Sequence, residues 1–265
     1  MSHFDENLTP VLALANNSDL EPLVDYIKKA SLTETLTIND LYKKFTPSHT
    51  EYVELIEREI RQFGGNSFLN VFRGNGPKYY EIVCDVASKL GANYNRNSTI
   101  EEVENAITMR IMSQAWEKMS EEERQILLNE MGIATGLGSI PKAFPVAALQ
   151  VAIRASGFAA YKLALIVANA IAKAILGRGL ALATNATLTR SIAIFAGPIG
   201  WIITGIWTLL DLAGPAYRVT IPCVVHIAML RQQYSLIKCD KCAAPRTKGA
   251  KFCQNCGTKL DDTEL

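Results

Sequence analysis

Two Cys-x-x-Cys pairs place the strongest constraint on how this 265-residue sequence can fold. The pairs are Cys239–Cys242 and Cys253–Cys256, and ten residues separate them. Each pair can form a knuckle that directs two thiolates at one metal ion, and two knuckles complete a tetrahedral site of four sulfur ligands. Such a site leaves no position for water, so we expect one structural Zn²⁺ ion. The metal would supply most of the folding free energy, because so short a module has almost no core.

The other two cysteines, Cys84 and Cys223, lie alone in apolar surroundings. Thiols kept for a metal favour a reducing compartment, where disulfides do not persist. The first residues also lack a basic segment followed by an apolar run, so no signal peptide is expected. The cytoplasm is therefore the predicted location.

The distribution of charge divides the sequence into three stretches. Residues 1–132 carry 13 Lys and Arg against 21 Asp and Glu, whereas residues 133–230 carry seven bases and one acid. Residues 231–265 carry seven bases and four acids. We therefore predict an acidic helical domain over residues 1–132, then an apolar, sparsely basic helical region over 133–235 packed on it. The zinc ribbon follows over 236–265.

Helix start signals are frequent in the acidic stretch. Four segments fit the S-x-x-E capping box, in which a Ser oxygen and a Glu carboxylate satisfy amides of the first helical turn; they begin at Ser18, Ser48, Ser98 and Ser120. Apolar residues then recur at helical spacing, and no segment alternates in the period of a strand. The predicted fold class is all-α: a multi-helix N-terminal body, an apolar helical hairpin region and the small zinc ribbon.

Two glycine-rich interruptions, at residues 64–66 and 73–77, break the helical pattern. Turn chemistry is the favoured interpretation, because neither fits a phosphate-binding motif. Glu81 and Asp85 follow one helical turn apart and are the nearest approach to an acidic pair, although a solvated helix face explains them. The candidate functional turn comprises Gly64, Gly65, Arg73, Glu81 and Asp85.

The segment Pro145–Leu176 is apolar apart from a narrow cationic stripe that includes Arg154, Lys162 and Lys173. Such a helix can lie in a membrane interface, with lysine stems reaching the headgroups, or form a core helix of a soluble bundle. It is a poor straight span, because a lysine near its middle costs about 2.5–3.5 kcal/mol on insertion.

Residues 191–210 form a charge-free run that contains Trp201 and Trp207. About 20 residues at about 1.5 Å each match a hydrocarbon core of about 30 Å. However, Gly197, Pro198 and Gly200 predict a break, so two half-length helices fit as well as one span. The excess of bases favours contact with anionic lipid, and burial inside a soluble helical domain is the alternative.

Several short motifs resemble the YaaW family of bacterial proteins. The resemblance rests on Phe63-Gly-Gly-Asn-Ser-Phe68, Arg73-Gly74, Tyr80-Glu-Ile-Val-Cys-Asp-Val86, Asn93-Tyr-Asn95, Gly197-Pro-Ile-Gly-Trp201 and Ala213-Gly-Pro-Ala-Tyr-Arg-Val-Thr-Ile-Pro222. Asn17-Ser-Asp-Leu-Glu-Pro-Leu-Val24 resembles a short N-terminal module found with that family. The resemblance covers about residues 5–235 and carries over no activity; the cysteine module is an addition to the family pattern.

No catalytic motif stands out, and the three histidines lie in unlike surroundings. We therefore predict a non-enzymatic protein that contacts membrane lipid at the inner face of a bacterial membrane and docks a protein partner through the ribbon. A pore-forming variant is the sharper form of this hypothesis. Nucleic acid is disfavoured, because Phe252 is the single aromatic residue of the ribbon. The alternatives are a soluble adaptor or chaperone-like protein, and an enzyme centred on Arg73, Glu81 and Asp85. The sequence does not set the oligomeric state.

Overall fold

The structure is a computed structural model. It describes residues 4–30, 35–64, 76–95, 97–133, 140, 142–155, 157–180, 194–210, 216–236, 239, 241–242, 251–253 and 256–260.

Helices are the dominant regular elements of the described residues, which confirms the predicted all-α class. Beyond them, the described residues contain one isolated antiparallel bridge, between Phe252 and Lys259. The helices are α1 (Thr9–Leu14), α2 (Asn17–Ala30), α3 (Thr35–Ile38), α4 (Asp40–Phe45), the 3₁₀ helix η1 (His49–Tyr52), α5 (Val53–Phe63), α7 (Tyr79–Leu90), α8 (Ile100–Trp116), α9 (Glu121–Glu130), α10 (Val146–Ala155), α11 (Gly157–Leu176), α13 (Ala196–Leu210) and α14 (Ala216–Ser235).

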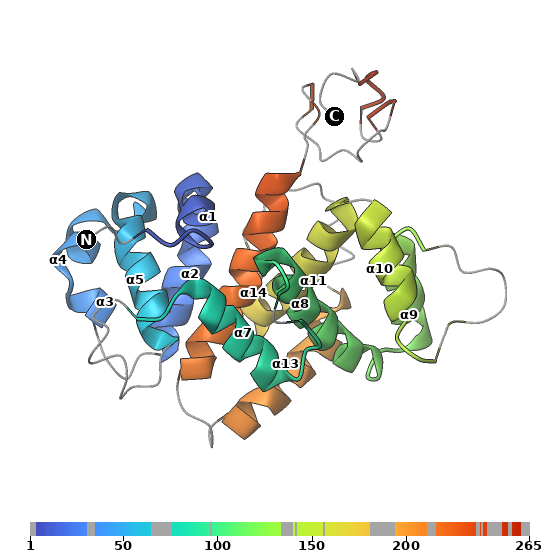
Figure 1. The fold of residues 1–265 in the computed structure, drawn as a ribbon, viewed down its shortest axis with the longest axis horizontal. Helices are drawn as coiled ribbons and strands as arrows, with labels where there is room; N and C mark the ends of the chain where they lie inside the picture. The colour runs from blue at the N-terminus through green and yellow to red at the C-terminus, as the bar shows by residue number, and fades with distance from the viewer. Residues whose placement is uncertain are drawn as a thin grey trace.

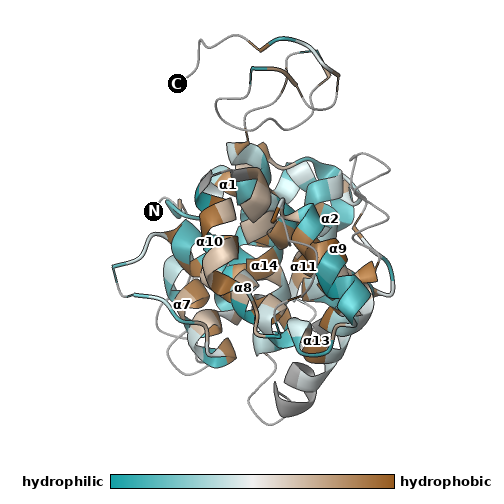
Figure 2. Ribbon diagram, turned by 90° about the vertical axis from the view of Figure 1, so that its right-hand side faces the viewer, coloured by the Kyte–Doolittle hydropathy of each residue, from teal (hydrophilic) through white to brown (hydrophobic). Residues whose placement is uncertain are grey.

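Helix α14 is the central element of the bundle (Figure 1). Every residue from Val219 to Leu230 is buried, so this helix is covered on all sides. It contacts α2, α5, α7, α8 and α11, which come from both the acidic stretch and the apolar stretch of the sequence. In Figure 2 apolar segments gather on α11 and α14 inside the bundle, and α2 and α9 present hydrophilic surface.

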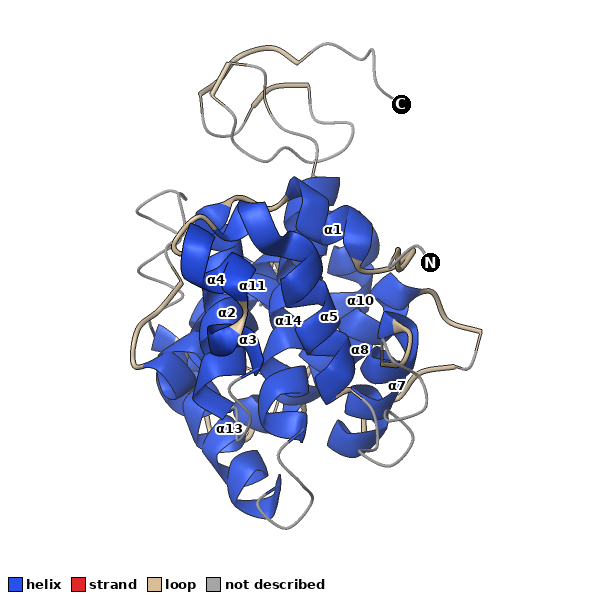
Figure 3. Ribbon diagram, turned by 90° about the vertical axis from the view of Figure 1, so that its left-hand side faces the viewer, coloured by secondary structure: helices blue, strands red, loops and turns tan. Residues whose placement is uncertain are grey.

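Buried residues on both sides of residue 132 belong to one hydrophobic cluster, which extends from Leu8 to Leu230. The two stretches are also joined at the surface, where Arg178 forms ion pairs with Glu21 at 3.1 Å and with Asp25. The predicted domain boundary at residue 132 stays a prediction. The cysteine segment lies beyond the C-terminal end of α14, away from the helical body, in all three views (Figures 1, 2 and 3).

Capping explains where several helices begin, and the structure refines the predicted start sites. The capping box at Ser120 and Glu123 is present at the start of α9. At α8 the box is formed by Thr99 and Glu102, one residue later than predicted, and Thr99 has the extended backbone of a cap. At α2 the capping pair is Asn16 and Asp19, whose side chains each accept a backbone N–H of the other.

Asp5 caps two helices at once. Its Oδ1 accepts the backbone N–H groups of Asn7 and Leu8, which precede α1, at 3.0 and 3.2 Å. Its Oδ2 accepts the N–H of Tyr79, the first residue of α7, at 2.8 Å. A carboxylate at a helix N-terminus also interacts favourably with the helix dipole. Asp5 therefore fixes the N-terminal segment against α7.

The apolar region differs from its predicted layout. The segment predicted as one helix over Pro145–Leu176 is two helices, α10 and α11, so Arg154 lies on a different helix from Lys162 and Lys173. The charge-free segment forms one helix from Ala196, with Pro198 in its first turn, where a missing N–H costs nothing. Residues 191–193 lie outside the described residues, and α13 has 15 residues.

Candidate metal centre

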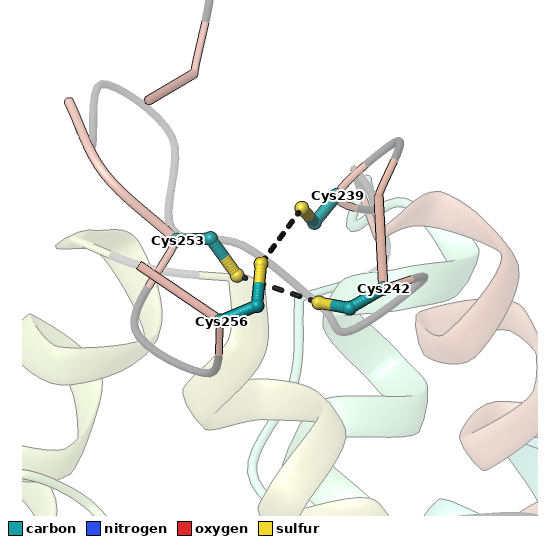
Figure 4. A group of neighbouring side chains, drawn as sticks. All are labelled: Cys239, Cys242, Cys253 and Cys256. Atoms are coloured by element: carbon teal, nitrogen blue, oxygen red, sulfur yellow. Dashed lines mark hydrogen bonds between the residues drawn. The ribbon is translucent and has the colours of Figure 1, made fainter. Parts of the chain in front are cut away.

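The four cysteines of the two pairs come together in space. Their sulfur atoms all lie within 4.8 Å of one another. Figure 4 shows the four side chains pointing toward a common centre, with Cys239 opposite Cys256 and Cys242 opposite Cys253. The two sulfur–sulfur distances across the centre are 3.8 and 3.6 Å. These distances far exceed a disulfide bond of about 2.05 Å.

The spacing of the sulfur atoms fits a tetrahedral metal site. For a metal–sulfur bond of about 2.3 Å, the edge of a regular tetrahedron is about 3.8 Å. The two distances across the centre, 3.8 and 3.6 Å, agree with that edge. Four thiolates are also soft donors that suit zinc or an iron–sulfur cluster rather than calcium or magnesium. The residues therefore can hold a metal, with all four positions taken by the protein.

A small hairpin holds the second cysteine pair. The N–H of Cys253 donates to the carbonyl of Thr258 at 2.8 Å, and the N–H of Gly257 donates to the carbonyl of Cys253 at 2.9 Å. Gly257 has a φ of 71°, a left-handed conformation that glycine adopts without steric cost. Leu260 is buried with Cys239 and Cys253 in a cluster separate from the main core.

The surroundings of Cys256 favour its thiolate. Its sulfur lies 3.2 Å from the hydroxyl of Thr258, and Cys256 is exposed. The side-chain and backbone hydrogen bonds from Thr258 lower the pKa of Cys256 to about 6. Metal ligation requires the thiolate, so this environment suits a ligand. Cys239 and Cys253, by contrast, are buried.

The hairpin also presents an exposed aromatic side chain among lysines. Phe252 is 58% exposed and is bridged to Lys259. Lys241, Lys251 and Lys259 are exposed as well. The remaining basic residues of this segment, Lys238, Arg246 and Lys248, lie outside the described residues. Among the described residues of the ribbon, Phe252 and its lysine neighbours therefore face solvent.

The membrane-interacting candidates lie in different environments. Arg154 on α10 and Lys173 on α11 are exposed. Lys162 instead forms a contact inside the protein: its ammonium donates to the backbone carbonyl of Glu130 at 2.8 Å and to its carboxylate at 3.2 Å. Trp201 is 78% exposed on α13, and the side chain of Trp207 lies outside the described part. Lipid contact by these residues stays a prediction.

One described helix is long and apolar enough to cross a membrane, Phe158–Leu176 within α11. In the structure 72% of that window is buried inside the protein. A core helix of a helical bundle has the same composition, so the length of α11 does not separate the two interpretations.

The candidate functional turn is described in part. Gly64 ends α5, and a Cβ atom there would lie 2.3 Å from the Ile82 side chain, so the glycine lets α5 approach α7 closely. Glu81 and Asp85 are exposed on α7. Burial, followed by the charge of Glu81, raises the pKa of Asp85. Gly65 and Arg73 lie outside the described residues, so their relation to the two acids stays a prediction.

A buried ionic network was missed at the level of sequence. Glu104 on α8 is 1% exposed and accepts hydrogen bonds from Arg231 on α14 and from the Tyr79 hydroxyl on α7. Burial raises the pKa of Glu104 to about 7, and the contacts with Arg231 and Tyr79 oppose that rise. One signal was available: Glu104 stands between Val103 and Ile107 on the apolar side of its helix.

Comparisons with known proteins agree with the resemblance predicted from the motifs. Residues 48–226 match the model of the Ubiquinol-cytochrome C chaperone family. A UPF0174 protein of Helicobacter pylori strain J99 is 42% identical over 208 residues, covering 78% of this chain and 82% of the relative. A UPF0174 protein of strain 26695 is 37% identical, covering 76% and 97%. UPF0174 protein YaaW of Escherichia coli K12 is 29% identical, covering 78% and 84%. No solved structure matches.

Proposed function

We propose that this chain, which belongs to the UPF0174 family, is a non-enzymatic, chaperone-like helical protein that binds other proteins. One observation carries the proposal: the match to the Ubiquinol-cytochrome C chaperone family over residues 48–226. That range runs from the start of η1 to the middle of the buried helix α14, so it includes most of the helical body. In this proposal the helical body accordingly carries the chaperone-like activity, and the ribbon adds a docking contact.

The cysteine centre, in this proposal, holds one structural Zn²⁺ ion through Cys239, Cys242, Cys253 and Cys256. The ion supplies structure rather than reactivity, because four protein ligands leave no position for a substrate. The small cluster around Leu260 offers little apolar burial, so metal ligation contributes most of the stability of the hairpin. The support is the agreement of the sulfur distances with a tetrahedral site.

The ribbon serves as a docking module for a protein partner. Phe252 supplies an exposed apolar anchor, and Lys251 and Lys259 supply positive charge beside it. Aromatic anchors ringed by polar residues are the usual centre of a protein–protein contact. Because the ribbon lies beyond the end of α14, it can reach a partner without rearrangement of the helical core (Figure 1).

The place of action is the inner face of the cytoplasmic membrane of a bacterium. Two observations support this part of the proposal. Residues 133–230 carry seven bases and one acid, which favours an anionic surface. Trp201 is also largely exposed on a helix without charged residues. Contact with lipid is peripheral in this proposal, because α11 is largely buried inside the protein.

An aggregation assay tests the chaperone-like activity. A chemically denatured reporter protein is diluted into buffer with the full chain, and light scattering is followed. We expect the full chain in molar excess to suppress scattering, whereas an equal mass of serum albumin does not. The variant Phe252→Ala separates the ribbon from the body: suppression by this variant assigns the activity to the helices. Scattering unchanged by the full chain refutes the proposal.

A further inference from the structure

Helix α13 has two faces of opposite character. Phe195, just before α13, and Ile199 and Ile203 within it recur at every fourth position and are buried in the core, and α13 packs against α8 and α11. The outward face carries Gly197, Trp201, Thr204 and Gly205; Trp201, Thr204 and Gly205 lie four, seven and eight positions after Gly197. These spacings place the four residues on one side of the helix.

The outward face lacks the features of a surface designed for water. No charged residue occurs between Ile194 and Leu210. Trp201 is 78% exposed, the highest value among the exposed large apolar side chains of the described residues. The hydroxyl of Thr204 donates to the carbonyl of Gly200 within the helix at 2.9 Å. A threonine satisfied by its own helix tolerates an apolar environment.

The neighbouring helix α11 carries an exposed base, Lys173, one residue from the point where it contacts α13. A Cβ atom at Gly200 would lie 3.9 Å from the Cβ of Ala174, so α13 and α11 approach closely there. Ala174 is itself exposed, and Lys173 beside it is exposed as well. The one acid of residues 133–230 is Asp211, beyond the end of α13. The apolar face can contact the acyl chains, and the base on the neighbouring helix is attracted to anionic headgroups.

The long apolar helix α11 is a weaker candidate for lipid contact. Most of it is buried, and Lys162 in its second turn donates hydrogen bonds to Glu130. Helix α11 supports α13 from inside the bundle. Of these two helices, α13 therefore offers the exposed apolar surface.

We propose that the outward face of α13, centred on Trp201, is the surface through which this protein docks on an anionic bilayer. The inference rests on the membrane association in the proposed function and identifies the surface that contacts lipid. Helix α13 would lie in the plane of the interface, with Trp201 at the level of the headgroups, where tryptophan is enriched in membrane proteins. The bundle behind it stays folded, because Phe195, Ile199 and Ile203 keep their internal contacts.

Vesicle flotation of the full chain tests the docking surface. Vesicles are made of phosphatidylcholine alone or of an equal mixture with phosphatidylglycerol. We expect the wild type to float with the anionic vesicles and to be released at high salt. Trp201→Ala should lower the partition coefficient by about tenfold or more, because a large aromatic side chain loses its apolar contact.

A matched pair of charge variants separates the face from the net charge. Thr204→Glu places a carboxylate on the outward face, and Leu14→Glu places one at another exposed apolar position, on α1. Both change the net charge by the same amount at exposed sites, and circular dichroism checks that both remain folded. Thr204→Glu should abolish flotation and Leu14→Glu should retain it.

The outcomes distinguish the two levels of the proposal. If the wild type floats and all three variants float equally, the face on α13 is refuted and membrane association by another surface remains. If the wild type stays at the bottom of the gradient with both kinds of vesicle, membrane association itself is refuted. Equal flotation with neutral and anionic vesicles refutes the role assigned to the neighbouring base.

Discussion

Arg231 on α14 donates hydrogen bonds to both carboxylate oxygens of Glu104 on α8. Nε lies 2.8 Å from Oε2, and Nη2 lies 3.2 Å from Oε1. The hydroxyl of Tyr79 on α7 donates to the same Oε1 at 3.1 Å. Arg231 and Glu104 are 127 positions apart in the sequence. Together with Tyr79 they join three helices around one buried carboxylate.

Removing the cation of this pair should lower the stability of the folded protein. Arg231→Leu leaves Glu104 buried without its partner, and we expect the free energy of unfolding to fall by about 3–5 kcal/mol above the pKa of Glu104. The double variant Glu104→Gln with Arg231→Leu removes both charges and keeps an acceptor for Tyr79, so it should recover more than half of that loss. Urea denaturation measures both. If the single and the double variant lose the same free energy of unfolding, the loss does not come from leaving the charge of Glu104 unpaired.

Glu104 and His226 should give stability opposite dependences on pH. Burial raises the pKa of Glu104 to about 7 and lowers the pKa of His226 to about 4. Between about pH 4.5 and 7 the folded state holds the Glu104 proton more tightly than the unfolded state, so its contribution to stability falls as pH rises. Between about pH 4 and 6.5 the unfolded state binds the His226 proton more tightly, so that contribution rises.

Variants separate the two effects that offset each other in the wild type. The stability of the wild type minus that of Glu104→Gln should fall with rising pH, and the same difference for His226→Gln should rise. Each slope should approach about 1.4 kcal/mol per pH unit. Urea denaturation at several pH values provides the measurement, and the other carboxylates cancel in the differences. Flat differences would show that neither group titrates abnormally in the folded protein.

The sequence predicted some local features correctly, because their causes are local, although the capping box predicted at Ser48 is wrong: Ser48 precedes η1 without a side-chain cap hydrogen bond. The capping box at Ser120 needs only a Ser and a Glu three residues apart, and it is where the pattern placed it. The two Cys-x-x-Cys pairs likewise carry their geometry in their spacing, and their sulfur atoms do converge. At α8 the start was misplaced by one residue, since Ser98 and Thr99 both offer a capping oxygen and the choice depends on the backbone.

Features that depend on distant partners could not be predicted in the same way. Nothing near Glu104 indicates that Arg231 will reach it, because the two come together only when α8 packs against α14. The sequence placed Lys162 in a cationic stripe suited to lipid headgroups. In the structure its ammonium instead donates to the backbone carbonyl of Glu130, at the end of α9. The hydropathy of α11 suits lipid and protein interior equally, and packing alone decides which surrounds it.

Gly76 should tolerate alanine far less well than Gly177. Both have left-handed backbone, with φ of 73° and 75°. A Cβ atom at Gly76 would lie 2.4 Å from the carbonyl oxygen of Arg61, whereas at Gly177 it would meet nothing within 4 Å. We expect Gly177→Ala to lower stability by about 1–2 kcal/mol and Gly76→Ala by about 2–5 kcal/mol. Equal losses in thermal unfolding would mean that backbone strain alone matters at both sites.

Removing the metal should unfold the ribbon and leave the helices intact. The purified full chain should contain one zinc ion, measured by elemental analysis. Cys253→Ser should lose that ion, and Cys84→Ser, which changes a partly buried cysteine on α7, should retain it.

Treatment of the wild type with a chelator should open the segment after α14 to proteases, because its cluster of Cys239, Cys253 and Leu260 is too small to hold the fold alone. Far-ultraviolet circular dichroism should change little, since the helices share a separate core. Loss of helical signal on chelation, or equal zinc in the two cysteine variants, would refute a metal-dependent ribbon independent of the helical body.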